Sequence, residues 1–516
     1  MLDKPDCIRL RGERHRCLMA VMAPLIVKDG NWPSFKGLLE EAKNIGVEAV
    51  TVDIWWGKVM QDRHSPDWEY YIKIFRIICD HGLDIVPIFS LHHGGGSVGD
   101  GNLNIPIPGW VYNQLAREAG LEPNDLKYES ETGTLQSDAL PVWATVGAHG
   151  PVVMAAVRIF FQAFTQVPFF QELAKAGAFP ELNISLGPAG ELRYPSYNES
   201  DGWKFPDRGF FQCYGRLARQ SFREWAQNRL EWLERDNPDA ASNSWIVFQR
   251  NAAHGTDLYE NIRPPGGEYA PLQLPHARAD ESMRNIDYMN NEYGQDFTRW
   301  YHECLLEHGK TLLREANSSF SKDPFASIPL GMKIPGIHWQ WRCTGVPRMA
   351  EITAGLIAAN ASIVPPGDKT APRSTGYDSI FNMVRDLKSE FGNSRDIIVH
   401  FTALEMDSKF PNCNSNDTFK TSDPQTLVRC VANAAQKAEG MSQVDPVTLR
   451  GENALICVIN EDHNSEVTDW EKIGEIFTAG HFTGFTLLRL VCTCWEKEKE
   501  AFEKFIKAYD THRRSL

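Results

Sequence analysis

Short apolar runs rich in β-branched residues recur along the 516-residue chain, and turn-forming residues bound each run. Several of the segments between them repeat apolar positions every three or four residues, which is the period of a helix. Alternation of buried strands and amphipathic helices is typical of a parallel sheet. We count eight predicted strands, at 18–25, 47–56, 84–93, 182–191, 327–339, 396–406, 446–455 and 482–490. Because eight parallel strands close a (β/α)8 barrel, we predict an α/β fold of this TIM-barrel type.

The predicted helices are clearest at 34–46, 67–82 and 423–440, each of which ends at a glycine suited to a helix C-terminus. Two connections, 94–150 and 192–325, are far longer than an ordinary βα loop of roughly 2 to 6 residues. They follow the third and fourth predicted strands, on the face where barrels build their sites. We therefore expect a single barrel domain over residues 1–516 with two long loop excursions.

Composition narrows the choice of partner. The chain is 42% apolar and 23% charged, so it can bury a large core, and its formal net charge is −14. An acidic balance argues against nucleic acid or an anionic membrane as the main partner. No apolar run approaches the roughly 20 residues that span a bilayer. A neutral ligand, with no nucleic acid and no membrane partner, is the simplest expectation.

The cysteines and the first residues of the chain bear on the cellular compartment of the protein. The 11 cysteines are scattered from Cys7 to Cys494 without the dense spacing of a secreted disulfide scaffold, so we expect reduced thiols. Residues 1–25 begin charged and run into the first predicted strand, with no separate apolar signal segment. We expect a cytoplasmic protein, and the sequence leaves its oligomeric state open.

Polar residues stand at the carboxyl end of nearly every predicted strand, where a barrel assembles its active site. In chain order they are Asp53, His92, His93, Glu191, Lys333, His338, Thr402, Glu405, Glu452, Asn453 and Arg489. Glu191 and Glu452 end strands four and seven, so they should face each other across the mouth. Two such carboxyl groups suit glycoside hydrolysis, with inversion at a separation of about 6.5 to 9.5 Å and retention near 5 Å. The sequence does not determine the distance between the two carboxyl groups, so both outcomes stay open.

Several motifs carry a family resemblance. The string LGPAGELRYPSY at 186–197, followed by GWKFPDRGFFQCY at 202–214, closely resembles the segment that presents the catalytic acid in the β-amylase family. RGENAL at 450–455 resembles the segment that bears the family's catalytic base. Residues 90–111 look like its mobile outer lid, and HFTALEM at 400–406 looks like its inner loop. The resemblance spans the chain from the first predicted strand to the last.

The resemblance implies an inverting enzyme that releases β-maltose from the non-reducing ends of starch or maltooligosaccharides, with Glu191 as general acid and Glu452 as general base. It places substrate contacts at Asp53, His92, Asp100, Lys333, His338, Thr402, Asn453, Ala454 and Arg489. Lys333 and His338 would hold sugar hydroxyls beside the acid, and Thr402 would stabilise the base. Asp53, His92 and Asp100 would grip the non-reducing end. We expect no metal, no cofactor and no separate starch-binding domain.

Other interpretations of these residues stay open. Glu191 can instead form an ion pair with Arg193, and Glu452 can be a buried carboxylate bonded to backbone. Asp53 and Arg489 can form an ion network inside the barrel. We interpret Glu405 as a supporting group. The predicted lid departs from the family pattern at Gly94 and Ser97, where the family more usually has Cys and Asn, and the base motif continues ICVIN in place of PRYD.

Alternative functions follow from other patterns. Gly94, Gly96 and Gly99 match the dinucleotide-binding spacing, but NIPIPGW follows them where that motif needs a helix. Cys492 and Cys494 with Cys457 have no second cysteine pair at zinc-ligand spacing. The alternative that remains is a non-catalytic protein that senses glucan or maltose on the same fold.

Overall fold

The computed structural model describes residues 18–95, 103–199, 202–251, 292–341, 348–359, 376–392, 395–406, 422–436, 446–454, 458, 469–478 and 482–515.

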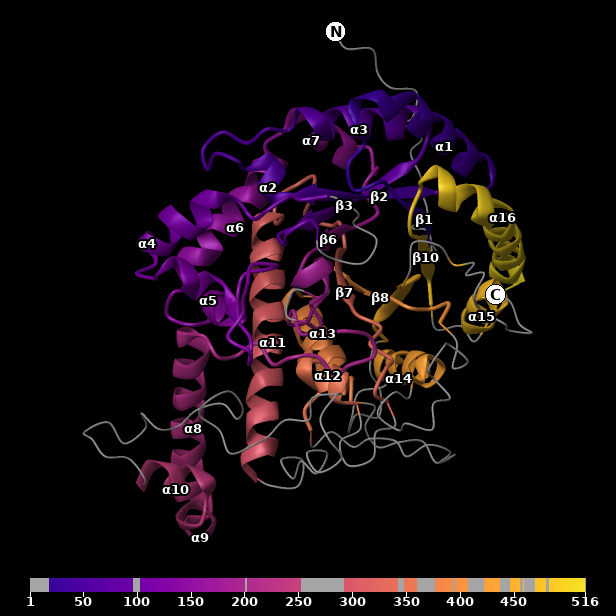
Figure 1. Ribbon diagram of the computed structural model, residues 1–516. Helices are drawn as coiled ribbons and strands as arrows, with labels where there is room; N and C mark the ends of the chain where they lie inside the picture. The colour runs from indigo at the N-terminus through magenta and orange to yellow at the C-terminus, as the bar shows by residue number, and fades with distance from the viewer. Residues whose placement is uncertain are drawn as a thin grey trace.

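Eight parallel strands form a closed barrel in the order β1-β10-β9-β8-β7-β6-β3-β2 (Figure 1). The barrel strands are β1 (Leu18–Met22), β2 (Ala49–Trp55), β3 (Asp84–Ser90), β6 (Leu182–Ile184), β7 (Leu330–Ile334), β8 (Ile397–Phe401), β9 (Thr448–Glu452) and β10 (Gly484–Leu487). Each lies inside one of the eight predicted runs, so the predicted (β/α)8 barrel is confirmed. The strands are shorter than predicted because most polar residues at their carboxyl ends lie in the loops beyond the ladder.

Helices surround the barrel. The predicted helices correspond to α1 (Trp32–Asn44), α3 (Glu69–Asp80) and the described part of α14 (Pro424–Gln436). Gly46 and Gly82 follow α1 and α3 with φ of 101° and 68°, a left-handed conformation that ends a helix with little strain only at glycine. The other helices after strands include α2 (Trp56–Val59), α12 (Met349–Thr353), α13 (Asp378–Glu390), α15 (Asp469–Thr478) and α16 (Cys492–Ser515).

Both long excursions carry secondary structure. The first holds α4 (Ala116–Glu118), a small hairpin of β4 (Tyr128–Glu129) and β5 (Leu135–Gln136), and α5 (Val142–Val146). The second holds α8 (Arg216–Asp236), α9 (Pro238–Ser242), α10 (Trp245–Asn251) and α11 (Glu292–Ser319). Helix α8, with α9 and α10 at its far end, extends away from the barrel beside α11 (Figure 1).

An aromatic cluster joins the barrel to α6 (Gly150–Thr165) and α7 (Pro168–Lys175). The ring of Phe164 lies 5.0 Å from that of Phe89 in β3 and 4.5 Å from that of Phe170 in α7. No single described helix is long and apolar enough to cross a membrane, and α6 and α7 meet that test only as a pair bent by 72°. The apolar face of α6 is instead occupied by this cluster.

The described cysteines are not all reduced. Cys494 is in a disulfide, so the expectation of reduced thiols is wrong at this position. The free thiols among the described residues are Cys79, Cys213, Cys304, Cys430 and Cys492.

Replacing Phe164 with alanine should lower the free energy of unfolding by about 3 to 5 kcal/mol, because the ring is fully buried and its loss leaves a cavity. Urea unfolding measures the change. Leu135→Ala serves as a control, because Leu135 is 43% exposed and its truncation should cost less than about 0.5 kcal/mol. Equal losses for the two variants would contradict this packing.

Candidate active site at the barrel mouth

A tight turn after β6 presents Glu191. Ala189 and Gly190 adopt positive φ of 54° and 81°, which reverses the chain and returns Glu191 alongside β7. There Glu191 forms a bridge with Lys333, and the Leu192 amide donates to the Lys333 carbonyl at 2.8 Å. Only glycine fits at 187, because a Cβ there would lie 2.6 Å from the Glu191 carbonyl oxygen. The glycine at position 187 in LGPAGE therefore has a local steric cause.

Glu191 is 9% exposed, and its carboxyl group has three polar neighbours. Arg193 Nε donates to Oε2 at 2.7 Å, and Thr402 Oγ1 lies 3.5 Å from Oε1. Tyr197 is also hydrogen-bonded to Glu191, and burial raises the pKa of its phenol so that the hydroxyl keeps its proton. The ion pair with Arg193, one of the interpretations left open by the sequence, is thus present, and its presence is compatible with a catalytic role for the same carboxyl group.

Glu452 is the last residue of β9 and is 2% exposed. The Lys333 ammonium lies 2.8 Å from both of its carboxylate oxygens. His400 Nδ1 lies 3.6 Å from Oε1. Lys333 therefore contacts both halves of the site, Glu191 through its backbone and Glu452 through its side chain.

Two histidines at the mouth are held neutral. Burial lowers the pKa of His92 to about 4, against the opposing charge of Asp53, and burial also lowers the pKa of His338 to about 4. His92 Nδ1 bonds Ser185 Oγ at 2.9 Å, and His338 Nδ1 bonds Ser422 Oγ at 2.5 Å. Near neutral pH both rings are therefore uncharged hydrogen-bonding groups.

Four further predicted contacts lie in or just after β2, β9 and β10. Asp53 accepts a bond from Ser90 Oγ at 2.8 Å and lies 3.6 Å from Arg489 Nη1, so the barrel ion pair considered from the sequence does form. The Asn453 side chain exchanges two hydrogen bonds with the backbone of Leu488. The Ala454 amide donates to both Glu405 oxygens, which fits a supporting role for Glu405. Asp100 lies outside the described residues.

Two side chains have different neighbours from those the resemblance implies. The Lys333 ammonium contacts the predicted base, whereas it was expected beside the acid. Thr402 lies beside the predicted acid, whereas it was expected beside the base, and its Oγ1 also accepts the Gly336 amide at 2.8 Å. Lys333 lies on β7 and Thr402 directly follows β8, and these two strands are adjacent in the barrel.

Gly94 has a structural reason to differ from the family pattern. Its backbone pairs with Ile105 in both directions, and a Cβ at position 94 would lie 2.8 Å from the Trp55 ring. Any larger side chain would have to displace Trp55. Ser97 lies outside the described residues, as do all of residues 96–102 of the predicted lid.

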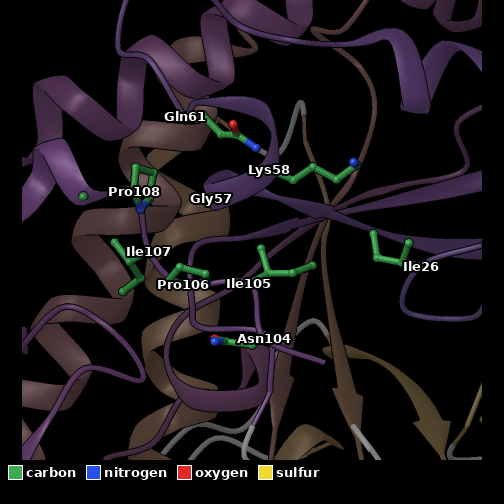
Figure 2. A pocket seen from close by; sticks show the side chains of 10 residues that line it. Ile26, Gly57, Lys58, Gln61, Asn104, Ile105, Pro106, Ile107 and Pro108 are labelled. Carbon is green, nitrogen blue, oxygen red and sulfur yellow. The ribbon is translucent and has the colours of Figure 1, made fainter. Parts of the chain in front are cut away.

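A pocket of about 400 Å³ lies beside the mouth (Figure 2). Its walls come from Ile26 after β1, from Gly57, Lys58 and Gln61 in and after α2, and from residues 104–109. None of the predicted catalytic or substrate-contacting residues lines it. His93, whose Nε2 bonds Asn104 at 2.9 Å, links this wall to the end of β3 and so faces a different partner from His92.

Sequence reasoning missed a set of buried ionisable side chains in the barrel, formed by Glu181, His400 and Arg450. The available signal was the two-residue period of a strand, since Arg450 and Glu452 occupy alternate positions of β9 and so share a face. No group of three or more possible metal-ligating side chains occurs in the described part of the chain.

Two buried glutamates at the mouth of a (β/α)8 barrel are the arrangement of a glycoside hydrolase. The sequence matches the profile of glycosyl hydrolase family 14 over residues 20–508. It is 31% identical to a β-amylase of Bacillus cereus over 476 residues, which are 91% of this chain and 70% of that protein. It is 29% identical to the chloroplastic β-amylase 2 of Arabidopsis thaliana over 91% of this chain and 74% of that one.

Structural comparison agrees. The catalytic domain of a β-amylase from Paenibacillus polymyxa superposes with a TM-score of 0.68 at 28% identity, covering 96% of this chain and 99% of that one. A β-galactosidase of Halorubrum lacusprofundi, at 12% identity and a TM-score of 0.52, shares the fold alone. The chain belongs to glycosyl hydrolase family 14, and it is a glycosidase of the β-amylase type.

The buried histidines predict loss of stability in mild acid. The pKa of His92, His308 and His338 is about 4 in the folded protein, below the ordinary value near 6.5, so the unfolded chain binds more protons between these limits. Unfolding free energy should therefore fall as pH drops from about 6.5 to 4, by at most about 3 kcal/mol per histidine.

Urea unfolding at a series of pH values measures this slope. Glu181 does not contribute to it, because its pKa of about 2 confines its effect to pH below about 4.5. Constant stability from pH 6.5 to 4.5 would contradict the buried, neutral state of these histidines.

Proposed function

We propose that the protein releases β-maltose from the non-reducing ends of starch-type α-1,4-glucans by a single inverting displacement, with Glu191 as general acid and Glu452 as general base. The observation that carries the proposal is the placement of both glutamates beside Lys333, Glu191 through a backbone bridge and Glu452 through the ammonium. The β-amylase names of the relatives supply the substrate class.

Glu452 suits the base. A buried carboxylate without a partner would take up a proton, whereas the adjacent ammonium of Lys333 stabilises its charged form. An ionised Glu452 can accept a proton from a water molecule that attacks the anomeric carbon. Because Glu452 is almost fully buried, that water can reach its carboxylate only from the barrel mouth.

Glu191 suits the acid, on the other side of β7. It would protonate the glycosidic oxygen and become a carboxylate as the bond breaks. Arg193, Tyr197 and Thr402 are all placed to donate to that carboxylate, so they stabilise the charge that forms during the reaction.

The part of the mouth formed by Asp53, Arg489 and His92 suits the terminal sugar of a glucan chain. The Asp53–Arg489 pair offers charged hydrogen-bonding groups at a fixed distance, and His92 offers a neutral ring. Sugar hydroxyls both donate and accept hydrogen bonds, so such a mixed set can bind the terminal residue of an uncharged polymer.

Glu191→Gln and Glu452→Gln should each reduce kcat on soluble starch by about 100- to 10,000-fold, because each removes one proton transfer. Maltose affinity should change little, as the side-chain volume is kept. Glu390→Gln is the matched control, since Glu390 is a surface carboxylate paired with Arg314. A residual rate above a tenth of the parent, or maltose binding with no turnover in the unmodified protein, would reject the proposal.

The two roles separate with α-maltosyl fluoride, whose leaving group needs little protonation. Glu191→Gln should hydrolyse this substrate far better than starch, and Glu452→Gln should hydrolyse neither. The reverse pattern would exchange the two assignments.

Removing the Arg193 charge should shift the alkaline limb of the kcat/KM profile upward by roughly one pH unit. Without the guanidinium, Glu191 holds its proton to higher pH and remains an acid there. Arg208→Gln is the control, because it breaks a comparably buried pair with Glu131 away from Glu191. An alkaline limb that stays in place or moves down in Arg193→Gln would contradict the role of Glu191.

A further inference from the structure

Three buried charged residues lie inside the barrel below Glu452. Glu181 precedes β6, His400 belongs to β8 and Arg450 to β9. His400 Nε2 lies 2.6 Å from Glu181 Oε1, and Arg450 Nη1 donates to Glu181 Oε2 at 2.6 Å. All three are buried, with exposed fractions of 0% for Glu181, 2% for His400 and 8% for Arg450.

The strand register places this set directly against the catalytic layer. Lys333 pairs with His400, and His400 pairs with Arg450, so the three side chains share the inner face of adjacent strands. Glu452 occupies the next inward position of β9 beyond Arg450. The set and the proposed base therefore form one continuous stack of charges.

Two glycines leave space for the stack. A Cβ at Gly331 would lie 3.1 Å from Glu181 Oε1 and 2.8 Å from Asn183 Nδ2. A Cβ at Gly484 would lie 3.0 Å from the Arg450 side chain. The barrel interior is thus shaped around these polar groups where other barrels place branched apolar side chains.

The geometry of His400 indicates its protonation. Its Nε2 faces Glu181, and its Nδ1 lies 3.6 Å from Glu452 Oε1 with no hydrogen-bond partner among the described residues. Burial would raise the pKa of Glu181, but the charge of Arg450, whose Nη1 lies 2.6 Å from Oε2, lowers it, so Glu181 is ionised. Carboxylates only accept hydrogen bonds. A neutral ring would turn a lone pair toward one of the two carboxylates, whereas an imidazolium presents an N–H to each.

We propose that His400 is a positioning residue for the general base, an imidazolium that Glu181 anchors below Glu452 and that keeps the Glu452 carboxylate ionised and oriented toward the attacking water. This inference rests on the proposed function. Glu452 then faces two cations, Lys333 from β7 and His400 from β8. His400 faces two carboxylates, Glu181 and Glu452, and Arg450 neutralises the far side of Glu181.

His400→Gln tests the role through the pH profile. Glutamine still donates to Glu181 but carries no charge, so Glu452 should take up a proton at higher pH. The acidic limb of kcat/KM on maltopentaose should move upward by roughly one pH unit while the alkaline limb stays in place. A parallel loss of kcat/KM at every pH, with neither limb displaced, would show a merely structural histidine and overturn the inference.

His302→Gln is the matched control. His302 is equally buried on α11, where it bonds the Gly355 carbonyl and Ser379 Oγ away from the mouth. The His302→Gln variant should be less stable than the parent protein, and neither limb of its kcat/KM profile should move. Glu181→Gln should move the acidic limb in the same direction as His400→Gln, because the anchor of the imidazolium is weakened, and an unmoved limb in this variant would also count against the proposal.

Neutron diffraction of the unmodified protein tests the same point without any variant. Deuterium is expected on both ring nitrogens of His400 at a pH where the enzyme is active, and deuterium on one nitrogen alone would overturn the proposal. The proposed function fails separately, if Glu452→Gln remains active. An inactive Glu452→Gln together with an unmoved limb in His400→Gln would reject the positioning role alone.

Discussion

The ammonium of Lys333 lies 2.8 Å from both carboxylate oxygens of Glu452 inside the barrel, where both side chains are almost removed from solvent. Transfer of either charge alone into this interior would cost several kcal/mol, so each residue depends on the other for its ionised form. The pair requires β7 and β9 to keep their positions on either side of β8. The register of the barrel strands and the charge pairing in the site therefore depend on each other.

The rest of the mouth is organised from the same strand. The Lys333 backbone aligns Glu191, and the turn at 187–190 that delivers Glu191 depends on glycine where the chain passes close to itself. Arg193 approaches Glu191, and His400 approaches Glu452. Each carboxyl group thus has a basic side chain of its own as a neighbour, although the two glutamates share Lys333.

The sequence predicted the barrel because strands and helices have different hydrophobic periods, and all eight strands lie where those periods change. The sequence also identified polar residues at the strand ends, such as Asp53 and Glu452, because strand periodicity locates those ends. The partners of those residues could not be predicted. Whether the Lys333 ammonium reaches Glu191 or Glu452 depends on register and tilt, which no local pattern specifies. The Glu181–His400 pair joins residues 219 positions apart, so only the closed barrel brings them together.

In the proposed mechanism the two glutamates act from opposite faces of one sugar, which fixes the stereochemistry of the product. Proton NMR during the first minutes of digestion of soluble starch, before mutarotation, measures the anomer released. The account predicts β-maltose first, with the α-anomer rising only as mutarotation proceeds. Initial release of α-maltose would contradict it, because retention requires a covalent intermediate on one of the two glutamates.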